Sequence, residues 1–374
     1  MIDLKSQYEK IKREIDNSVL DCIASADYIN GPQVKTFQKS LEEYLSVKHV
    51  IPCANGTDAL QIAMMALELQ SGDEVIVPSF TYVATAEVIA LLGLKPVMVE
   101  VDTNSFNITA ETIEAAVTPN TKAIVPVHLF GQSCDMEAIM QIAEKYGLFV
   151  IEDNAQAIGA DYTFSDETQR KTGTIGHIGC TSFFPSKNLG CYGDGGAMFT
   201  NDDILAEKLR MIANHGQAKK YFHSVIGVNS RLDSIQAAIL SVKLKYLDEY
   251  CAARQLVAAG YDAAFSEIDE LQIPARQPNS THVFHQYTLQ IKNGKREALK
   301  HYLTANGVPS MVYYPLPLYR QDAFRQFVTP DFLLPITEKL CESVLSLPID
   351  TEMTYETLNV ITRSVKDFFD KKPG

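Results

Sequence analysis

Hydrophobic and polar residues alternate along the chain in the way expected of strands joined by amphipathic helices. Between about residue 30 and residue 250, short runs rich in β-branched residues are followed by longer stretches with helical apolar spacing. This pattern predicts βα units around a buried, mostly parallel sheet. The predicted strands are His49–Cys53, Glu74–Val77, Pro96–Val101, Ala123–Val127, Phe149–Asp153, Thr181–Phe184 and Ala197–Thr200. The predicted helices are Thr57–Leu69, Tyr82–Leu92, Asp135–Tyr146 and Asp202–Ile212.

The pattern changes in the last third of the chain. A long helix is predicted at Ser234–Tyr250, and after it strands and helices are mixed, with a strand at His285–Ile291 and a helix at Lys295–Asn306. No repeat or low-complexity linker interrupts the sequence before this point. We therefore expect an α/β protein with a large domain over residues 1–250 and a smaller C-terminal α+β domain over residues 251–374.

Composition excludes several classes of partner. Of the 374 residues, 46% are hydrophobic and 21% are charged, which is typical of a globular protein with a large core. The net charge of −13, without a cluster of Lys and Arg, disfavours nucleic-acid binding. Seven scattered cysteines lack metal-ligand spacing and predict reduced thiols. No secretory signal or membrane-spanning run is present, so we expect a soluble, cytoplasmic protein.

A lysine follows a predicted strand in the segment Thr181-Ser-Phe-Phe-Pro-Ser-Lys187-Asn-Leu-Gly-Cys-Tyr-Gly-Asp-Gly-Gly196. Four glycines lie within the next nine residues, which allows the backbone to approach a ligand closely. A lysine amine that is desolvated, or placed beside another cation, can form an imine with an aldehyde. A surface lysine in a glycine-rich turn explains the same residues, so the neighbouring motifs must decide.

A second candidate segment is an apolar strand that ends in acidic residues, Leu148-Phe-Val-Ile-Glu-Asp153-Asn-Ala-Gln156-Ala-Ile-Gly159. Open α/β sheets place their ligands at the carboxyl ends of strands. A carboxylate at this position could keep a pyridine nitrogen protonated and so strengthen the ring as an electron sink. A simple helix cap is an equally good interpretation of Asp153.

Two further strand-to-helix junctions carry candidate ligand contacts. Cys53-Ala-Asn-Gly56-Thr57-Asp58 places a glycine turn before a helix start, and the free amides of such a start bind anions such as phosphate. Thr57 could equally be an ordinary N-cap. Pro78-Ser-Phe-Thr-Tyr82-Val-Ala-Thr85 offers an aromatic ring that could stack on a flat cofactor, although a tyrosine here is more often simply packed.

Together these segments resemble the sugar aminotransferases of the DegT/DnrJ/EryC/StrS family, which depend on pyridoxal phosphate (PLP) and have fold type I. The resemblance runs from Gly31-Pro-Gln to Tyr313-Tyr-Pro-Leu-Pro and rests on ANGTDAL, PSFTYVAT, EDNAQAIGA, SFFPSKNLGCYGDGGA and NSRLDSIQAA. It implies a large PLP-binding domain with a mixed, mostly parallel sheet and a smaller α+β domain, against which the N-terminal residues 1–25 pack.

The resemblance also implies roles for individual residues. Lys187 forms the Schiff base with PLP and then carries protons, while Asp153 pairs with the pyridine nitrogen. Tyr82 stacks on the cofactor, and Gln156 lies beside its ring hydroxyl. The phosphate is bound by Gly56, Thr57, the amide of Asp58, Ser182 and, from the neighbouring subunit, Asn229. An active site shared in this way makes a homodimer obligatory for function.

Details of the motifs point toward a substrate. Lysine at position 187 favours amino transfer, because a dehydrating subgroup has histidine there. The segments Asn214–Gln217, Lys220–His223 and Ile226–Asp233 look closest to enzymes that use L-glutamate to aminate UDP-2-acetamido-2-deoxy-3-oxo-glucuronate for surface polysaccharides such as O-antigen. Arg231 is the candidate partner of that sugar's carboxylate, with Tyr313 and Tyr314 nearby.

Several positions keep more than one interpretation. Arg231 could instead hold the structure or the dimer interface. His215 and His223 could contact nucleotide or phosphate, although lone histidines are more often structural. Many relatives read Pro-Leu-His where this chain reads Pro-Leu-Tyr319, which leaves the role of Tyr319 open.

Other classes of protein require different motifs in the sequence. A nicotinamide-dependent dehydrogenase would need GxGxxG after the first strand, and only one glycine is present there. A metal-dependent hydrolase would need clustered ligands such as HExxH, which the sequence lacks. A PLP aminotransferase acting on a dTDP- or UDP-linked keto-6-deoxyhexose, and a regulatory protein that keeps PLP without turnover, remain as alternatives.

Overall fold

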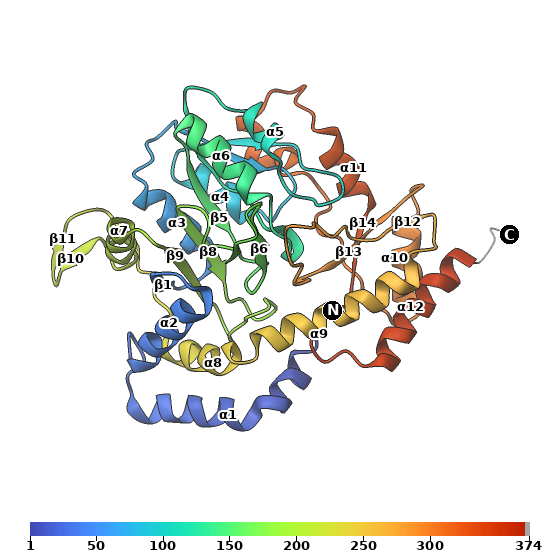
Figure 1. Cartoon of the computed structure of the whole chain (residues 1–374), viewed down its shortest axis with the longest axis horizontal. Helices are drawn as coiled ribbons and strands as arrows, with labels where there is room; N and C mark the ends of the chain where they lie inside the picture. The colour runs from blue at the N-terminus through green and yellow to red at the C-terminus, as the bar shows by residue number, and fades with distance from the viewer. Residues whose placement is uncertain (371–374) are drawn as a thin grey trace.

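Seven strands form the central sheet of the computed structural model, which describes residues 1–370 (Figure 1). The strands lie in the order β1-β9-β8-β5-β4-β2-β3, and all are parallel except β9, which is antiparallel to both of its neighbours. Their bounds are β1 His49–Cys53, β2 Glu74–Pro78, β3 Lys95–Val99, β4 Thr121–Ile124, β5 Phe149–Asp153, β8 Ile178–Ser182 and β9 Gly196–Thr200. The α/β class predicted from the sequence is confirmed.

Helices cover both faces of this sheet because its strands are apolar on both sides. In β2, Val75 and Val77 pack on one face with α3, α4 and α7, whereas Ile76 between them packs on the other face with α5 and α6. At the β1 end, α2 and α8 cover the second face. The bounds are α2 Pro32–Leu45, α3 Gly56–Ala66, α4 Ala84–Leu91, α5 Ala110–Glu114, α6 Met136–Tyr146, α7 Asp203–Ala213 and α8 Ser234–Leu244.

A second, antiparallel sheet with the order β12-β13-β14 forms the core of the C-terminal part, which lies opposite α7 in Figure 1. Its apolar residues pack with α9, α10 and α12. The bounds are α9 Leu247–Phe265, β12 Leu271–Gln272, β13 Tyr287–Ile291, α10 Arg296–Ala305, β14 Val344–Leu347 and α12 Tyr355–Asp370. The intervening elements η2 Leu318–Arg320, η3 Asp322–Phe327 and α11 Pro335–Ser343 contribute residues to the cores of the large sheet instead.

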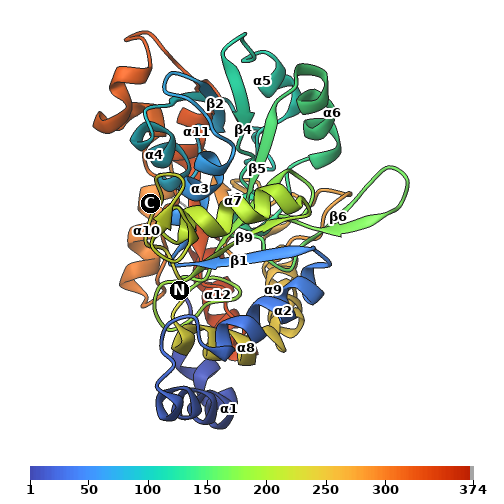
Figure 2. The same ribbon diagram turned by 90° about the vertical axis from the view of Figure 1, so that its left-hand side faces the viewer.

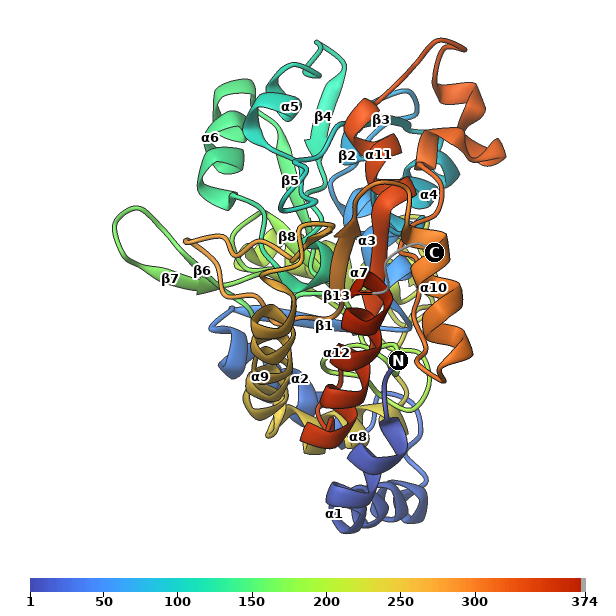
Figure 3. The same cartoon turned by 90° about the vertical axis from the view of Figure 1, so that its right-hand side faces the viewer.

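Two small hairpins and a short turn lie outside the two larger sheets. The hairpin β6 Asp161–Thr163 with β7 Gln169–Lys171 projects from the body of the molecule in Figures 2 and 3. The hairpin β10 Gln217–Lys219 with β11 Phe222–His223 follows α7. The turn η1 Leu129–Gly131 lies after β4.

The predicted long helix at Ser234–Tyr250 is wrong in one respect. The structure has two helices here, because α8 ends at Leu244 and α9 begins at Leu247. Tyr246 between them has non-helical backbone angles, and the two helices have different main neighbours: α8 packs on α1 and α2, whereas α9 packs on α12. The predicted domain boundary at residue 250 falls inside α9.

The N-terminal helix α1 (Leu4–Ser25) lies at one end of the molecule in all three views (Figures 1–3). It packs on α8 through Ile11 and Ile15. Its first turns also contact the C-terminal part, where the Gln7 side chain donates to Thr351 and Lys10 forms an ion pair with Glu352. No helix within residues 1–370 is both long and apolar enough to cross a membrane.

Candidate active site

A cavity of about 650 Å³ opens at the carboxyl ends of the parallel strands. The turns that follow β1, β2, β4, β5 and β8 all reach this edge of the sheet, and the C-terminal part closes the cavity from the other side. The sequence-predicted residues that line it are Gly56, Thr57, Tyr82, Asp153, Gln156, Ser182, Lys187, Tyr313 and Tyr314. Residues separated by more than 250 positions in the chain therefore share one cavity.

Lys187 enters the cavity from a tight turn after β8. Its backbone N–H donates to the Phe184 carbonyl at 2.8 Å. The chain returns so closely that a Cβ on Gly190 would lie 2.4 Å from the Pro185 carbonyl oxygen, so only glycine fits there. The Lys187 amine is not hydrogen-bonded or ion-paired to any described residue. Burial lowers the pKa of Lys187 to about 8, while the charge of Asp153 opposes that shift.

The lowered pKa predicts a pH dependence for the reaction of Lys187 with an aldehyde. Only the uncharged amine is nucleophilic. We expect the rate at which the cofactor-free chain takes up PLP to rise about tenfold per pH unit below pH 8 and to level off above it. Stopped-flow absorbance measures this rate. A rise that continues to about pH 10 would show that the amine keeps its ordinary pKa.

Asp153 faces the same cavity from the end of β5. Its Oδ2 accepts a hydrogen bond from the Thr85 hydroxyl at 2.8 Å, and its Oδ1 accepts one from the Ala155 amide at 3.1 Å. The backbone of Asp153 is fixed as well, because its N–H donates to the Pro126 carbonyl and its carbonyl accepts from His128 N–H. Thr85 lies in the first turn of α4 and is fully buried. The sequence analysis assigned it no role.

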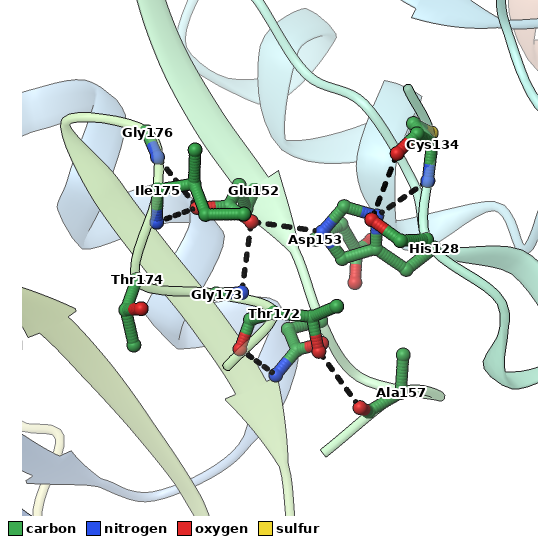
Figure 4. A network of polar contacts seen from close by, with 12 residues as sticks. His128, Cys134, Glu152, Asp153, Ala157, Thr172, Gly173, Thr174, Ile175 and Gly176 are labelled. Atoms are coloured by element: carbon green, nitrogen blue, oxygen red, sulfur yellow. Dashed lines mark hydrogen bonds and ion pairs between the residues drawn. The ribbon is translucent and has the colours of Figure 1, made fainter. Parts of the chain in front are cut away.

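Behind Asp153, the preceding residue of β5 anchors the site (Figure 4). Glu152 is fully buried, and its carboxylate accepts hydrogen bonds from the amides of Gly173, Ile175 and Gly176 at 2.8, 2.6 and 2.6 Å. The imidazole of His128 contacts the same carboxylate at 2.9 Å through Nε2. Since Nδ1 of His128 accepts from the Cys134 amide, Nε2 carries the proton.

We expect Glu152→Gln to destabilise the fold by about 3 kcal/mol, because an amide NH2 would face donors that need an acceptor. His128 cannot adapt by moving its proton, since Nδ1 already accepts from Cys134. Urea unfolding followed by circular dichroism measures the effect. Glu74→Gln is the matched control: Glu74 is a buried strand residue too, but its partners are side chains of Lys95 and Thr118 that can rearrange. An equal loss in both variants would contradict the special role of Glu152.

Gln156 links the cavity wall to Tyr314. Its Oε1 accepts from the Phe130 amide at 2.8 Å, and its Nε2 donates to the Tyr314 hydroxyl at 3.2 Å. Phe130 has a left-handed backbone with φ 57°, so this amide is held in an unusual direction. Burial raises the pKa of Tyr314, which keeps its hydroxyl protonated. The ring of Tyr82, 6.4 Å from that of Tyr314, is largely exposed beside the cavity.

The amino terminus of α3 forms a potential anion site. Asn55 is the N-cap of this helix, and its side chain accepts from the Asp58 amide at 2.8 Å. The interpretation of Thr57 as the N-cap is therefore wrong, and Asp58 is not among the cavity-lining residues. Gly56 and Thr57, whose amides have no partner within the helix, line the cavity together with Ser182. A Cβ on Gly56 would lie 2.7 Å from Ser182 Cβ.

Five residues that were singled out in the sequence do not line the cavity of this chain. Asn229 is exposed and pairs with Asn214 through the backbone. Arg231 is half-buried and forms no ion pair within the described chain. His223 and His215 are joined by a bond from the His223 ring to the His215 carbonyl at 2.8 Å. Tyr319 is buried elsewhere, where its hydroxyl donates to Glu338 and accepts from the Leu334 amide.

A buried lysine amine and a carboxylate that line one cavity are typical of enzymes in which the amine reacts with a carbonyl group and the carboxylate supports a bound ring. Within that class, the chain belongs to the DegT/DnrJ/EryC1/StrS aminotransferase family, whose sequence model matches residues 9–366. The family predicted from the motifs is thereby confirmed, and with it the prediction that the protein is an aminotransferase.

Two characterised relatives cover nearly the whole chain. It is 47% identical to the UDP-2-acetamido-2-deoxy-3-oxo-D-glucuronate aminotransferase of Pseudomonas aeruginosa, over 96% of this chain and 97% of the relative. It is 46% identical to a pleiotropic regulatory protein of Geobacillus stearothermophilus, over 99% of this chain and 98% of the relative.

Solved structures agree with the fold along the chain. The S. venezuelae protein DesV, solved in complex with a ketimine intermediate, is 36% identical with a TM-score of 0.95, over 100% of this chain and 98% of that one. NtdA of Bacillus subtilis, solved with bound PMP, is 31% identical with a TM-score of 0.89, over 97% of this chain and 82% of that one. The family depends on PLP.

Proposed function

We propose that this enzyme transfers an amino group from L-glutamate to UDP-2-acetamido-2-deoxy-3-oxo-D-glucuronate, with PLP as its cofactor and PMP as the cofactor form that carries the amino group during turnover. The observation that carries the proposal is the placement of Lys187, with its unbonded amine, and Asp153, with its fixed carboxylate, in one cavity. The named activity of the P. aeruginosa relative supports the choice of sugar.

The residues that line the cavity fit PLP. The amides of Gly56 and Thr57, with the hydroxyl of Ser182, form a donor set suited to a phosphate at a helix start. The buried hydroxyl oxygen of Thr81, which also lines the cavity, has no hydrogen-bond partner among residues 1–370. Tyr82 presents an exposed aromatic face on which a flat ring can stack.

When bound, PLP supplies an aldehyde that can take up an amino group and a ring that can accept an electron pair. Lys187 would hold it and, when its amine is free, would carry a proton between the substrate carbon and C4′ of the cofactor. Asp153 would keep the ring nitrogen protonated through its fixed carboxylate, which Thr85 orients. Gln156 and Tyr314 form a polar wall beside the ring.

The proposed homodimer completes the site from a second chain. The segment around β10 and β11 exposes Tyr221, Phe222 and Ile226, which a partner subunit would cover. Asn229 follows in this segment and is exposed, so it is available to the partner's phosphate site. Arg231 lacks an ionic partner among the described residues, so its guanidinium is available to the sugar carboxylate.

The test offers the purified enzyme, L-glutamate and a panel of UDP- and dTDP-linked keto-sugars, including the 3-oxo-uronate made in situ, and identifies the product by mass. We expect amination of the 3-oxo-uronate to exceed that of every keto-6-deoxyhexose. If a keto-6-deoxyhexose reacts faster, that sugar is the substrate instead. The dTDP-sugar transaminases among the relatives make this a concrete alternative. A coloured protein that turns over no sugar would support a regulatory role, as the name of the Geobacillus relative suggests.

A further inference from the structure

His285 lies in the wall of the cavity that contains Lys187. It lies two residues before the start of β13, and only 5% of its surface is exposed. Its Nδ1 is buried without a hydrogen-bond partner in the described part of the chain. Buried polar atoms are nearly always hydrogen-bonded in folded proteins, so an exception beside a reactive amine indicates a functional contact.

The backbone that carries His285 is fixed from several directions. The Val283 amide donates to the Gly131 carbonyl at 2.9 Å, and the Val283 carbonyl accepts from the Asn188 side chain at 2.9 Å. The guanidinium of Arg254 donates to the Phe284 carbonyl at 3.1 Å. Phe284 itself has φ 47°, a left-handed conformation that a bulky residue adopts only where its surroundings enforce it. Such enforced positions cluster at functional sites.

The hydrogen bond from Asn188 connects this segment directly to the Lys187 turn, because Asn188 follows Lys187 in the chain. The turn that carries Lys187 and the segment that carries His285 are therefore tied together. Two other side chains near His285 are cationic: Lys187 in the cavity and the buried Arg254 behind it. Burial, followed by these two charges, lowers the pKa of His285 well below its usual value. The acidic side chains that line the cavity are Asp153 and Asp194.

An uncharged imidazole can bind a neighbouring lysine, whereas a cationic imidazole repels it. Its unprotonated nitrogen accepts a hydrogen bond from an amine or ammonium without adding positive charge. A protonated imidazole would instead repel the Lys187 ammonium. The flexible side chain of lysine lets its amine reach the wall of the cavity whenever it is not covalently bound.

We propose that His285 is a positioning residue for Lys187: a ring nitrogen of the uncharged imidazole accepts a hydrogen bond from the free Lys187 amine and holds that amine in place for proton transfer. The inference rests on the proposed role of Lys187 and deepens it. Lys187 itself takes up and gives off the transferred proton, whereas His285 takes up no proton and only orients the amine.

The test compares the wild-type chain with His285→Leu and His285→Gln. The first readout is the pH dependence of PLP uptake by the full-length chain after removal of its cofactor, which reports the pKa of Lys187. We expect His285→Leu to lower the midpoint by about 0.5 pH unit or more, because the ammonium loses an acceptor. His285→Gln, whose amide oxygen can accept, should restore most of the shift. The second readout is kcat, which we expect to fall about tenfold in His285→Leu while KM for both substrates stays within about twofold.

The structural control is His282→Leu. His282 supports the same segment, because its Nδ1 accepts from the Phe284 amide at 3.1 Å and its ring stacks on Phe284 with 3.8 Å between centroids. We expect this variant to lower Tm without moving the midpoint of PLP uptake. An unchanged midpoint in His285→Leu, or an equal shift in His282→Leu, overturns the inference. Failure of the wild-type chain to take up PLP at any pH would instead overturn the proposed role of Lys187.

Discussion

Lys187→Ala is expected to abolish amino transfer, with a loss of at least about 10⁴-fold in kcat, because no other lysine among residues 1–370 lines the cavity to bind the cofactor and move the proton. The fold should persist, since the Lys187 side chain forms neither a hydrogen bond nor an ion pair in residues 1–370. The assay measures amino transfer from L-glutamate together with the absorbance of the covalently bound cofactor. Circular dichroism and Tm report whether the fold is intact.

Lys243 provides a closely matched control for this experiment. It is also buried, and burial likewise lowers its pKa to about 8. Its amine donates to the Gly190 carbonyl at 2.5 Å instead of facing the cavity. Lys243→Met should lower Tm but keep the cofactor absorbance and measurable amino transfer. Undiminished activity in Lys187→Ala, or loss of the covalent absorbance only in Lys243→Met, would refute the assignment of Lys187.

Asp153→Asn is expected to lower kcat by about 100-fold or more while Tm changes by only a few degrees. The substitution removes the negative charge that would keep a ring nitrogen protonated. It preserves the local hydrogen bonds, because an amide oxygen can still accept from Ala155 and the Thr85 hydroxyl can accept as well as donate. Steady-state kinetics at saturating substrates measure the effect, and near-normal rates would show that the ring nitrogen has another partner.

Thr85→Val separates the charge of Asp153 from its orientation. This variant keeps the carboxylate but removes the hydrogen bond to Oδ2. We expect an intermediate loss of about tenfold in kcat, with little change in cofactor binding, because only the direction of the carboxylate is relaxed. A loss as large as that of Asp153→Asn would mean that orientation, and not charge, accounts for the effect.

The sequence by itself determined the sheet and the family, and it predicted Lys187 and Asp153 as the central pair of the active site. The apolar strand runs are long enough, and their turns distinct enough, to predict each strand of the central sheet within a few residues. Lys187 and Asp153 were identified because both follow such strands, and parallel strands bring their carboxyl ends to one edge. Local pattern and chain direction are sufficient to predict the sheet and to bring both residues to one edge, whereas their roles were predicted from the combination of motifs that the family shares.

Only the tertiary structure decided which residues support that pair. Thr85 bonds to Asp153 across 68 positions, Gln156 bonds to Tyr314 across 158, and His285 reaches the cavity through a left-handed turn at Phe284. It also showed that Asn55, and not Thr57, caps α3, and that α8 and α9 are separate. Hydrogen bonds between distant segments and backbone conformations imposed by packing leave no periodic signal in the sequence, because they depend on what the folded chain brings alongside each residue.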